Sequence, residues 1–311
     1  MKILLIGYNR IGDTILSTGL INFLLNKYKN ASFTIVTSSI SVSIFEDMPQ
    51  LEELIIVDKK KYSLHWLEIW LKTKSVKWDL IVDLRSSSLA NILSCKQKMI
   101  FKGNMHEHKL DQLKKFIGSD DEIKPKIWAN DKNYLDIYEK KNLKNNYICI
   151  APISNFPGKD WSIKKYTSLL ENDLFKSYDI VILGATSDKK ELDDINQLVQ
   201  GSNQVIKNLI NDANLIETYF ILKKAALFLG SDSANMHMAV AANIPTIGLF
   251  GPTNEKLYGP LGKNNLSLRG DKSFSEIVNQ LDYKSGKIKS YLDNLSVTKV
   301  HKEIERILES K

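Results

Sequence analysis

The stretch from residue 228 to residue 253 constrains the fold most, because it combines apolar runs with one short helical segment. Residues 225–230 form an apolar run that predicts a strand buried on both faces. Asp232 or Ser233 is expected to cap the helix that follows. Residues 246–250 predict a second buried strand, which ends in a Gly-Pro-Thr turn. Such a strand–helix–strand unit predicts a parallel sheet whose ligands bind beyond the carboxyl ends of its strands.

The start of that helix carries the ligand chemistry of the unit. The first N–H groups of a helix have no internal partner, and the helix dipole adds partial positive charge, so this position suits a phosphate. The Asp232 carboxylate would repel a phosphate and is better matched to a sugar or ribose hydroxyl. Because capping residues occur at any helix start, the alternative is that Asp232 and Ser233 only cap a core helix on which His237 is buried.

Strands and helices alternate through both halves of the chain, which predicts an α/β fold in which right-handed crossovers join parallel strands. A chain of 311 residues exceeds the size at which one hydrophobic core stops growing, so we expect two domains, residues 1–143 and 144–311. A ligand cleft between two similar α/β domains is the expected geometry. The further predicted strands are residues 2–6, 33–37, 54–57, 80–83, 98–101, 147–151 and 179–183.

The formal net charge of +7 favours anionic partners such as nucleotides, phosphorylated sugars or an acidic membrane surface. The lysines are spread along the sequence without a zinc-finger, RNA-recognition or basic-zipper signature, so we expect no nucleic acid partner. Two cysteines, Cys95 and Cys149, are too few for a disulfide framework, which fits a reducing cytoplasm. No apolar run reaches membrane-spanning length, so we expect a cytoplasmic protein whose contact with the inner membrane is peripheral.

Residues 102–128 interrupt the alternation with a polar, basic segment. Two interpretations stay open for it, a solvated connector and a loop that faces an acceptor. His106 and His108 lie two residues apart without acidic or cysteine partners nearby, and no other grouping has metal-ligand spacing. We therefore expect no metal site.

Asp13 belongs to a motif, Asn9-Arg-Ile-Gly-Asp-Thr14, that follows the first strand and opens the first helix. This places Asp13 at or beside the N-cap. A carboxylate at a helix N-terminus is kept ionised by the helix dipole, which suits a base that awaits a hydroxyl proton. The alternative is a plain helix cap.

Lys159 belongs to a second motif, Ser154-Asn-Phe-Pro-Gly-Lys-Asp-Trp161, in the loop after the first strand of the second half. Its ammonium is placed to neutralise a diphosphate. The alternative is an ordinary surface lysine beside a turn.

Together these residues resemble glycosyltransferase family 9, the lipopolysaccharide heptosyltransferase family. The resemblance rests on three motifs in order, Arg10-Ile-Gly-Asp13, Lys159-x-Trp161, and Asp232-Ser-x-x-Met-His237 followed by Phe250-Gly-Pro-Thr253. It implies a GT-B fold, in which two Rossmann-like domains with parallel sheets face a central cleft. The acceptor then belongs to the N-terminal domain and the nucleotide sugar mainly to the C-terminal domain. It further implies an inverting, metal-independent transfer that needs no cofactor besides its ADP-heptose donor.

The resemblance also assigns roles to single residues of this sequence. Asp13 corresponds to the catalytic base, Ser154 and Lys159 to contacts with the diphosphate and sugar, Asp232 to the partner of a sugar hydroxyl, and Ser233 to a contact beside the phosphates. Asn155, Ala234 and His237 complete the predicted donor-binding set. The implied acceptor is an anionic glycolipid, the core of a lipopolysaccharide or lipooligosaccharide. The terminal amphipathic segment, residues 296–308, is of the kind that packs back on the first domain in this fold.

The donor motif departs from the family pattern at two places. Ala234-Asn235 stands where Gly-Pro is usual, and Asn155 stands where a second hydroxyl residue is common. These changes keep open a different nucleotide sugar, or a GT-B binding protein or epimerase in place of a transferase. A nicotinamide-dependent oxidoreductase would require a glycine fingerprint after a strand, which the sequence lacks.

Overall fold

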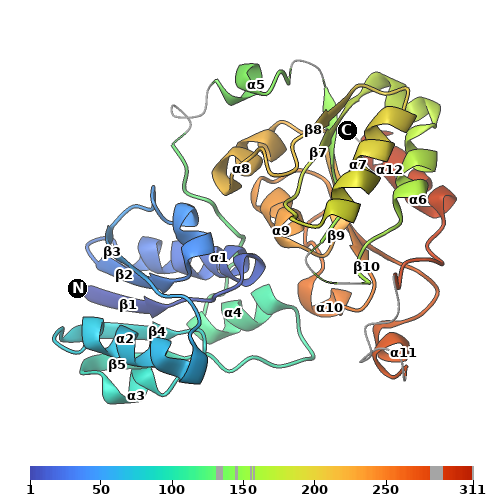
Figure 1. The fold of residues 1–311 in the computed structure, drawn as a ribbon. Coiled ribbons are helices and arrows are strands. Elements are labelled where there is room, and N and C mark those ends of the chain that lie inside the picture. Colours follow the sequence, from blue (N-terminus) through green and yellow to red (C-terminus); the bar gives the residue numbers. More distant parts are fainter. Residues whose placement is uncertain (131–135, 144–145, 155, 157, 281–289, 310–311) are drawn as a thin grey trace. The chain divides into compact units, whose positions relative to one another are not determined.

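The structure, a computed structural model, describes residues 1–130, 136–143, 146–154, 156, 158–280 and 290–309. Contacts between residues divide the chain into two compact units, residues 1–131 and 132–311. Each unit contains one parallel β-sheet with helices on both faces, as Figure 1 shows. The expected α/β class is therefore confirmed, and each unit is Rossmann-like.

The sheet of the first unit has the strand order β3-β2-β1-β4-β5, and its strands are parallel. They are β1 (Lys2–Ile6), β2 (Ser32–Thr37), β3 (Leu51–Ile56), β4 (Trp78–Asp83) and β5 (Cys95–Ile100). The apolar side chains from Ile3 to Ile6 are completely buried, because β1 lies at the centre of the sheet and is covered on both faces. The edge strands β3 and β5 keep several exposed positions.

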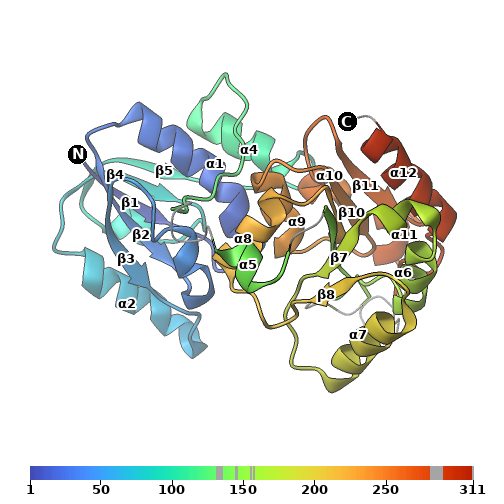
Figure 2. The ribbon, with the colours of Figure 1, turned by 90° about the horizontal axis from the view of Figure 1, so that it is seen from above.

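Helices α1 (Ile11–Lys27) and α4 (Lys109–Ile117) pack together on one face of this sheet, and α2 (Leu64–Thr73) and α3 (Leu89–Ile92) cover the other (Figures 1 and 2). The short 3-10 helices η1 (Ser39–Ile44) and η2 (Lys61–Ser63) lie in the connections on either side of β3. Ile69 of α2 and Leu89 of α3 enter the core beside Ile6 and Ile81 of the sheet. Burial of these apolar faces is the main driving force for this layer.

The sheet of the second unit has the order β11-β10-β9-β6-β7-β8 and is also parallel. Its strands are β6 (Tyr147–Ala151), β7 (Asp179–Ile182), β8 (Ile206–Asn208), β9 (Leu227–Ser231), β10 (Thr246–Phe250) and β11 (Asn265–Arg269). The two strands predicted around residues 225–250 are β9 and β10, and every residue of both is buried. The edge strands β8 and β11 were not predicted.

Helices α6 (Ile163–Leu170), α7 (Lys189–Gly201) and α12 (Val297–Glu309) cover one face of this sheet, and α8 (Leu215–Lys223) and α9 (Ala234–Ala241) cover the other (Figure 1). The shorter helices are α5 (Ile137–Lys140), η4 (Asp173–Ser177), α10 (Glu255–Tyr258) and α11 (Phe274–Val278). The terminal helix α12 packs on α6 and buries Val300, Ile304 and Ile307 in the core of the second unit. Its expected return to the first domain stays a prediction.

The division between the units falls about a helix earlier than the boundary expected at residues 143/144. Helix α5 contacts α8, and the Tyr138 hydroxyl donates to the Phe220 carbonyl at 2.7 Å. Lys141 Nζ lies 3.0 Å from Asp212 Oδ2. These contacts attach residues 136–143 to the second unit. In the described part of the chain, no helix has both the length and the apolar character needed to cross a membrane.

Candidate active site

The strand order of each sheet reverses once, between β1 and β4 in the first unit and between β6 and β9 in the second. In doubly wound sheets, ligands bind beyond the carboxyl ends of the strands at such a reversal. Lys159 lies in the loop after β6, and Asp232 follows β9 directly. Asp13 follows β1 of the first unit. The sequence motifs therefore lie at the reversal of their own sheets.

Lys159 and Asp232 form a buried ion pair. Lys159 Nζ donates to Asp232 Oδ2 at 2.9 Å and to the Asp232 carbonyl at 3.2 Å. The two side chains are only 17% and 9% exposed. On the other side of the carboxylate, His237 Nε2 lies 3.7 Å from Asp232 Oδ1. Lys159 is thus not an ordinary surface lysine, and three of the predicted donor-binding residues form one cluster.

The N-terminus of α9 is not capped by a side chain. Ser233 occupies the N-cap position, but its hydroxyl makes no capping hydrogen bond, and Asp232 is turned to Lys159. The expectation that Asp232 or Ser233 caps this helix is therefore wrong. The Ser233 Oγ is buried and has no hydrogen-bond partner among the described residues. An uncapped helix start beside an unused hydroxyl can bind an anion. Ala234, the first residue of α9, adds no side-chain donor there.

Asp160 is a titratable group at the same sheet edge. Burial raises its pKa to about 6, against the hydrogen bonds from Ser154 and Ser231 that lower it. The Ser231 hydroxyl lies 3.4 Å from Asp160 Oδ1 and donates to the Lys159 carbonyl at 3.0 Å. Ser154 is partly exposed beside this group, and Asn155 lies outside the described residues. Trp161 is a core residue, since it is buried and its indole N–H donates to the Leu295 carbonyl at 3.0 Å.

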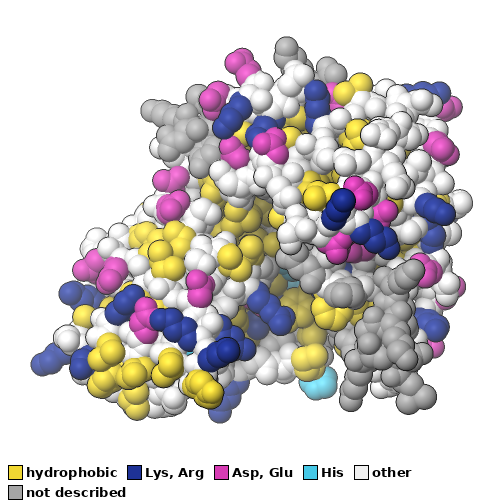
Figure 3. Space-filling view, viewed as in Figure 1, with side chains coloured by type: hydrophobic (Ala, Val, Ile, Leu, Met, Phe, Trp, Pro, Cys, Tyr) yellow, Lys and Arg dark blue, Asp and Glu magenta, His cyan; other side chains and the backbone are white. Residues whose placement is uncertain are grey.

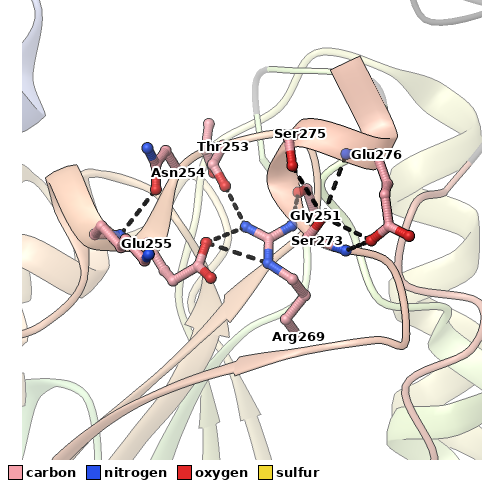
Figure 4. A network of polar contacts seen from close by, with 9 residues as sticks. Gly251, Thr253, Asn254, Glu255, Arg269, Ser273, Ser275 and Glu276 are labelled. Carbon is pink, nitrogen blue, oxygen red and sulfur yellow. Dashed lines mark hydrogen bonds and ion pairs between the residues drawn. The ribbon is translucent and has the colours of Figure 1, made fainter. Parts of the chain in front are cut away.

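The turn after β10 is held by Arg269, the last residue of β11, as Figure 4 shows. The guanidinium donates to the Gly251 and Thr253 carbonyls, and its Nε lies 3.1 Å from Glu255 Oε2. Burial acts to raise the pKa of Glu255, but the hydrogen bond and charge of Arg269 bring it below its ordinary value. Thr253 Oγ1 is buried without a hydrogen-bond partner in the described ranges. The Gly-Pro-Thr turn is thus rigid and presents an unused hydroxyl.

In the first unit, Asp13 is the third residue of α1, and Arg10 occupies the N-cap. The alternative of a plain helix cap is therefore wrong for Asp13. Within the described ranges, its carboxylate has no hydrogen-bond or ion-pair partner. It lies in the first turn of a 17-residue helix.

Lys109, the first residue of α4, brings a cation close to Asp13. Its Nζ lies 4.9 Å from the centre of the Tyr8 ring and 4.5 Å from that of Phe101. Burial lowers the pKa of Lys109, and the charge of Asp13 acts against this shift. The two charges interact without forming an ion pair, so both remain available to a bound molecule.

The polar segment after β5 is ordered by side-chain hydrogen bonds. The Gln112 side chain accepts from the Asn104 N–H at 2.8 Å and donates to the Asn104 and Glu107 carbonyls. His108 caps α4 by accepting from the Leu110 N–H at 3.1 Å. The part of the chain that the structure describes contains no group of three or more His, Cys, Asp or Glu side chains suited to a metal ion.

Residues 85–283 match the sequence profile of glycosyltransferase family 9 (heptosyltransferase), which is more than half of the chain. The chain belongs to glycosyltransferase family 9. It is similar to lipooligosaccharide heptosyltransferase 2 of Campylobacter jejuni, with 25% identity over 272 residues that cover 83% of each protein. Lipopolysaccharide heptosyltransferase 3 of Escherichia coli is 24% identical over 291 residues, which cover 81% of this chain and 84% of the relative.

Solved structures of the family share the fold. A family 9 glycosyltransferase from Veillonella parvula superposes with a TM-score of 0.80 at 19% identity and covers 100% of this chain and 97% of its own. ADP-heptose lps heptosyltransferase II of E. coli gives a TM-score of 0.75 at 17% identity and covers 100% and 99%. The glycosyltransferase has the GT-B fold, as expected. Family membership decides for a transferase and against the epimerase, the binding protein and the oxidoreductase.

Sequence reasoning missed three residues that the structure brings to these sites. Asp160 lies between Lys159 and Trp161 of the predicted motif, and a carboxylate next to a lysine that is predicted to bind a ligand is a signal that the sequence does contain. Arg269 lies on a strand that was not predicted. Lys109 lies just after His106 and His108, and its position beside Asp13 depends on how α4 packs on α1.

Proposed function

We propose that this family 9 glycosyltransferase transfers a heptose from ADP-heptose to the core of a lipopolysaccharide or lipooligosaccharide, with inversion and without a metal ion. The observation that carries the proposal is the buried cluster of Lys159, Asp232 and His237 beside the uncapped start of α9. The names of the relatives supply the sugar class, because they transfer heptose and one of them is described as using ADP-heptose.

The leaving diphosphate is stabilised by protein groups in this proposal. Lys159 supplies a positive charge, and the first N–H groups of α9 with the Ser233 hydroxyl supply hydrogen-bond donors. When Lys159 turns to the diphosphate, the Asp232 carboxylate becomes available to sugar hydroxyls. These groups fulfil the charge-neutralising role that a metal ion has in other transferases.

Asp13 is the catalytic base of the proposed reaction. Its carboxylate accepts the proton of the acceptor hydroxyl while the hydroxyl oxygen attacks the anomeric carbon from the face opposite the diphosphate. The C–O bond to the diphosphate breaks as the new glycosidic bond forms, so the configuration inverts.

Lys109 makes the acceptor side of this proposal specific for an anion. Its partly desolvated ammonium lies near Asp13 and has no carboxylate of its own in the described part of the chain. A phosphate or carboxylate on the acceptor would pair with it and place a neighbouring hydroxyl at Asp13. In the proposed function this acceptor is a glycolipid, and the reaction takes place at the cytoplasmic face of the inner membrane.

A family 9 transferase with another nucleotide sugar is the second candidate, favoured by Ala234-Asn235 at the start of α9. Where the family pattern has proline, Asn235 supplies an additional backbone N–H and an amide side chain. These donors would meet the first atoms of a ligand bound at the helix start. These N–H groups would change which nucleotide sugar the enzyme prefers and leave the chemistry of transfer unaltered.

The nucleotide sugar is tested by thermal shift with ADP, UDP, GDP and CMP and their sugar conjugates, because a ligand that binds the native state raises the melting temperature. We expect ADP and ADP-heptose to stabilise the protein. Transfer to a heptose-free core acceptor should then continue in EDTA and give a product of inverted anomeric configuration by NMR. Stabilisation by UDP conjugates alone would select the second candidate, and loss of transfer in EDTA would refute the metal-free mechanism.

A further inference from the structure

Helix α2 carries apolar side chains on two opposite sides. His65, Ile69 and Thr73 are buried toward the sheet, as expected for a helix that covers a core. Leu64, Leu67 and Leu71 are each more than half exposed. Spacings of three and four residues place these leucines on one stripe of the helix surface. Three exposed leucines on one stripe form an apolar patch of the kind that marks a contact with a partner or a membrane.

The turn before α2 presents a tyrosine in the same region. Tyr62 is 93% exposed, and both Tyr62 and Ser63 have left-handed backbone conformations, with φ angles of 54° and 57°. Neither residue is glycine, so this turn stores conformational strain. The turn leaves the Tyr62 side chain in solvent next to the start of α2.

Lysines surround the apolar stripe. Lys59, Lys60 and Lys61 precede the helix, and Lys72 and Lys74 follow its last leucine, all of them exposed. The one acidic residue of α2, Glu68, is already paired with Lys60 at 2.6 Å and Lys72 at 3.2 Å. The nearest acid before the lysines, Asp58, accepts a hydrogen bond from the Ser39 N–H. Figure 3 shows hydrophobic and lysine side chains gathered over the region of α2 and α3.

We propose that this α2 face, formed by Tyr62, the three exposed leucines and the five lysines, binds the surface of an anionic lipid bilayer. Leucines insert at the boundary of the acyl chains, a tyrosine is favoured at the level of the headgroups, and lysines pair with anionic lipids. A helix of ten residues is too short to cross a bilayer and therefore lies in the plane of its surface.

Charge decides for a membrane over a second copy of this chain. Two α2 faces in contact would bring ten lysines together against two glutamates that are already paired, which is strongly unfavourable. An anionic bilayer matches both the leucines and the lysines. The inference deepens the proposed function and rests on it in one respect: a lipid-linked acceptor gives the enzyme a reason to bind a membrane.

The binding test uses flotation of the full chain with two kinds of vesicle. One contains phosphatidylcholine alone, and the other also contains about 30% phosphatidylglycerol to imitate an anionic leaflet. We expect Leu67→Ser/Leu71→Ser to lower the vesicle-bound fraction roughly tenfold or more. Lys59→Gln/Lys61→Gln should lower it about tenfold in low salt, and high salt should abolish the difference. The matched controls in the second unit, Val205→Ser and Lys189→Gln/Lys190→Gln, should bind like the wild type.

Equal flotation of the wild type and the α2 variants would overturn the proposal, and so would equal binding to neutral and anionic vesicles. A dimeric wild type that the leucine variant converts to a monomer would assign the α2 face to a second copy instead. The substituted side chains are exposed, so melting temperatures should be unchanged.

A second acceptor separates this inference from the proposed function. With a delipidated, water-soluble core oligosaccharide, the α2 variants should transfer heptose at the wild-type rate, whereas with acceptor embedded in anionic vesicles they should be slower. Failure of the wild type on both acceptors would refute the proposed function, while flotation would still decide on the α2 face.

Discussion

Lys159 and Asp232 are 73 positions apart in the sequence, yet Lys159 Nζ lies 2.9 Å from Asp232 Oδ2. The pair joins the loop after β6 to the end of β9, the two strands that flank the reversal of the second sheet. In this state each charge neutralises the other. In the proposed function, a diphosphate at α9 would compete with Asp232 for the ammonium, and the displaced carboxylate would then meet the sugar hydroxyls. Donor binding would be an exchange of partners at a lysine that is already in place.

Lys159→Met should lower both stability and donor affinity, for separable reasons. The substitution leaves the Asp232 carboxylate buried without its cation, which we expect to cost about 2 kcal/mol of unfolding free energy. The double variant Lys159→Met/Asp232→Asn removes that penalty and should recover most of the stability in urea unfolding. Its affinity for ADP by calorimetry should stay at least roughly tenfold weaker. If the double variant recovers the affinity for ADP, Lys159 only neutralises Asp232 and does not contact the diphosphate.

Asp13→Asn should retain donor affinity and melting temperature but lose turnover roughly a hundredfold or more, because an amide cannot accept the proton. Folding should be nearly unchanged, since Asp13 does not cap α1 and has no hydrogen bond to lose within the described ranges. Asp111→Asn, a change of the acid in the first turn of α4, is the matched control. Near wild-type transfer by Asp13→Asn would remove Asp13 from the mechanism.

Lys109→Met keeps an unbranched apolar side chain at this position and removes the charge that lies beside the Tyr8 and Phe101 rings. The KM for an anionic acceptor should rise about tenfold, while the affinity for ADP stays unchanged. Lys114→Met on the same helix is the control. With an acceptor from which the anionic group has been removed, Lys109→Met and the wild type should have the same KM. If the KM values still differ, Lys109 acts on Asp13 and not on the acceptor.

Asp160 should make stability depend on pH. Its pKa is near 3.8 in the unfolded chain and about 6 in the folded protein, so the folded state binds more protons between these values. Stability from this group is complete below about pH 4 and is lost as the pH rises to 6. Asp160→Asn should therefore be more stable than the wild type above pH 6, by about 1 kcal/mol after solvent screening, and equal to it near pH 4. Thermal unfolding across this pH range measures the difference in stability between Asp160→Asn and the wild type. A difference that does not change with pH would contradict the raised pKa of Asp160.

Arg269→Lys should weaken donor binding about five- to tenfold with a smaller effect on kcat, because an ammonium cannot contact two carbonyls and Glu255 together. Glu255→Gln leaves both carbonyl contacts in place and should have a smaller effect on the donor KM. Addition of guanidinium to Arg269→Ala should restore part of the donor affinity. If Arg269→Lys and Glu255→Gln weaken donor binding equally, donor binding depends on the ion pair between Arg269 and Glu255 and not on the carbonyl contacts that hold the turn.

The sequence allowed prediction of the central strands because their apolar runs are continuous, as in β9 and β10, where every residue is buried. The edge strands β8 and β11 escaped prediction for the opposite reason. The residues of β8, Ile206-Lys-Asn208, and of β11, Asn265-Leu-Ser-Leu-Arg269, alternate or mix polar and apolar side chains and are short. Hydrogen bonding to a neighbouring strand fixes them, together with the few apolar side chains, such as Leu268, that reach the core.

For the candidate site, the sequence predicted which polar residues follow the buried strands but not which contacts they make. Asp13, Lys159 and Asp232 each follow a buried strand, and that position is visible in the sequence. The pairing of Lys159 with Asp232 depends on β6 and β9 being neighbours, which the sequence order does not reveal. Capping by Ser233 was wrong because the N-cap preference states what a side chain is able to do, whereas here the hydroxyl makes no hydrogen bond to the helix N–H groups.

The packing of α12 has a consequence for synthesis of the protein. Val300, Ile304 and Ile307 complete the core beneath α6, and the Leu295 carbonyl just before this helix accepts the indole N–H of Trp161. Residues 147–270 thus emerge from the ribosome with part of their core still open. The first unit is finished much earlier, because its contacts lie within residues 1–131. A nonsense codon shortly before residue 297 should therefore yield a folded first unit joined to a second unit that proteases and chaperones recognise.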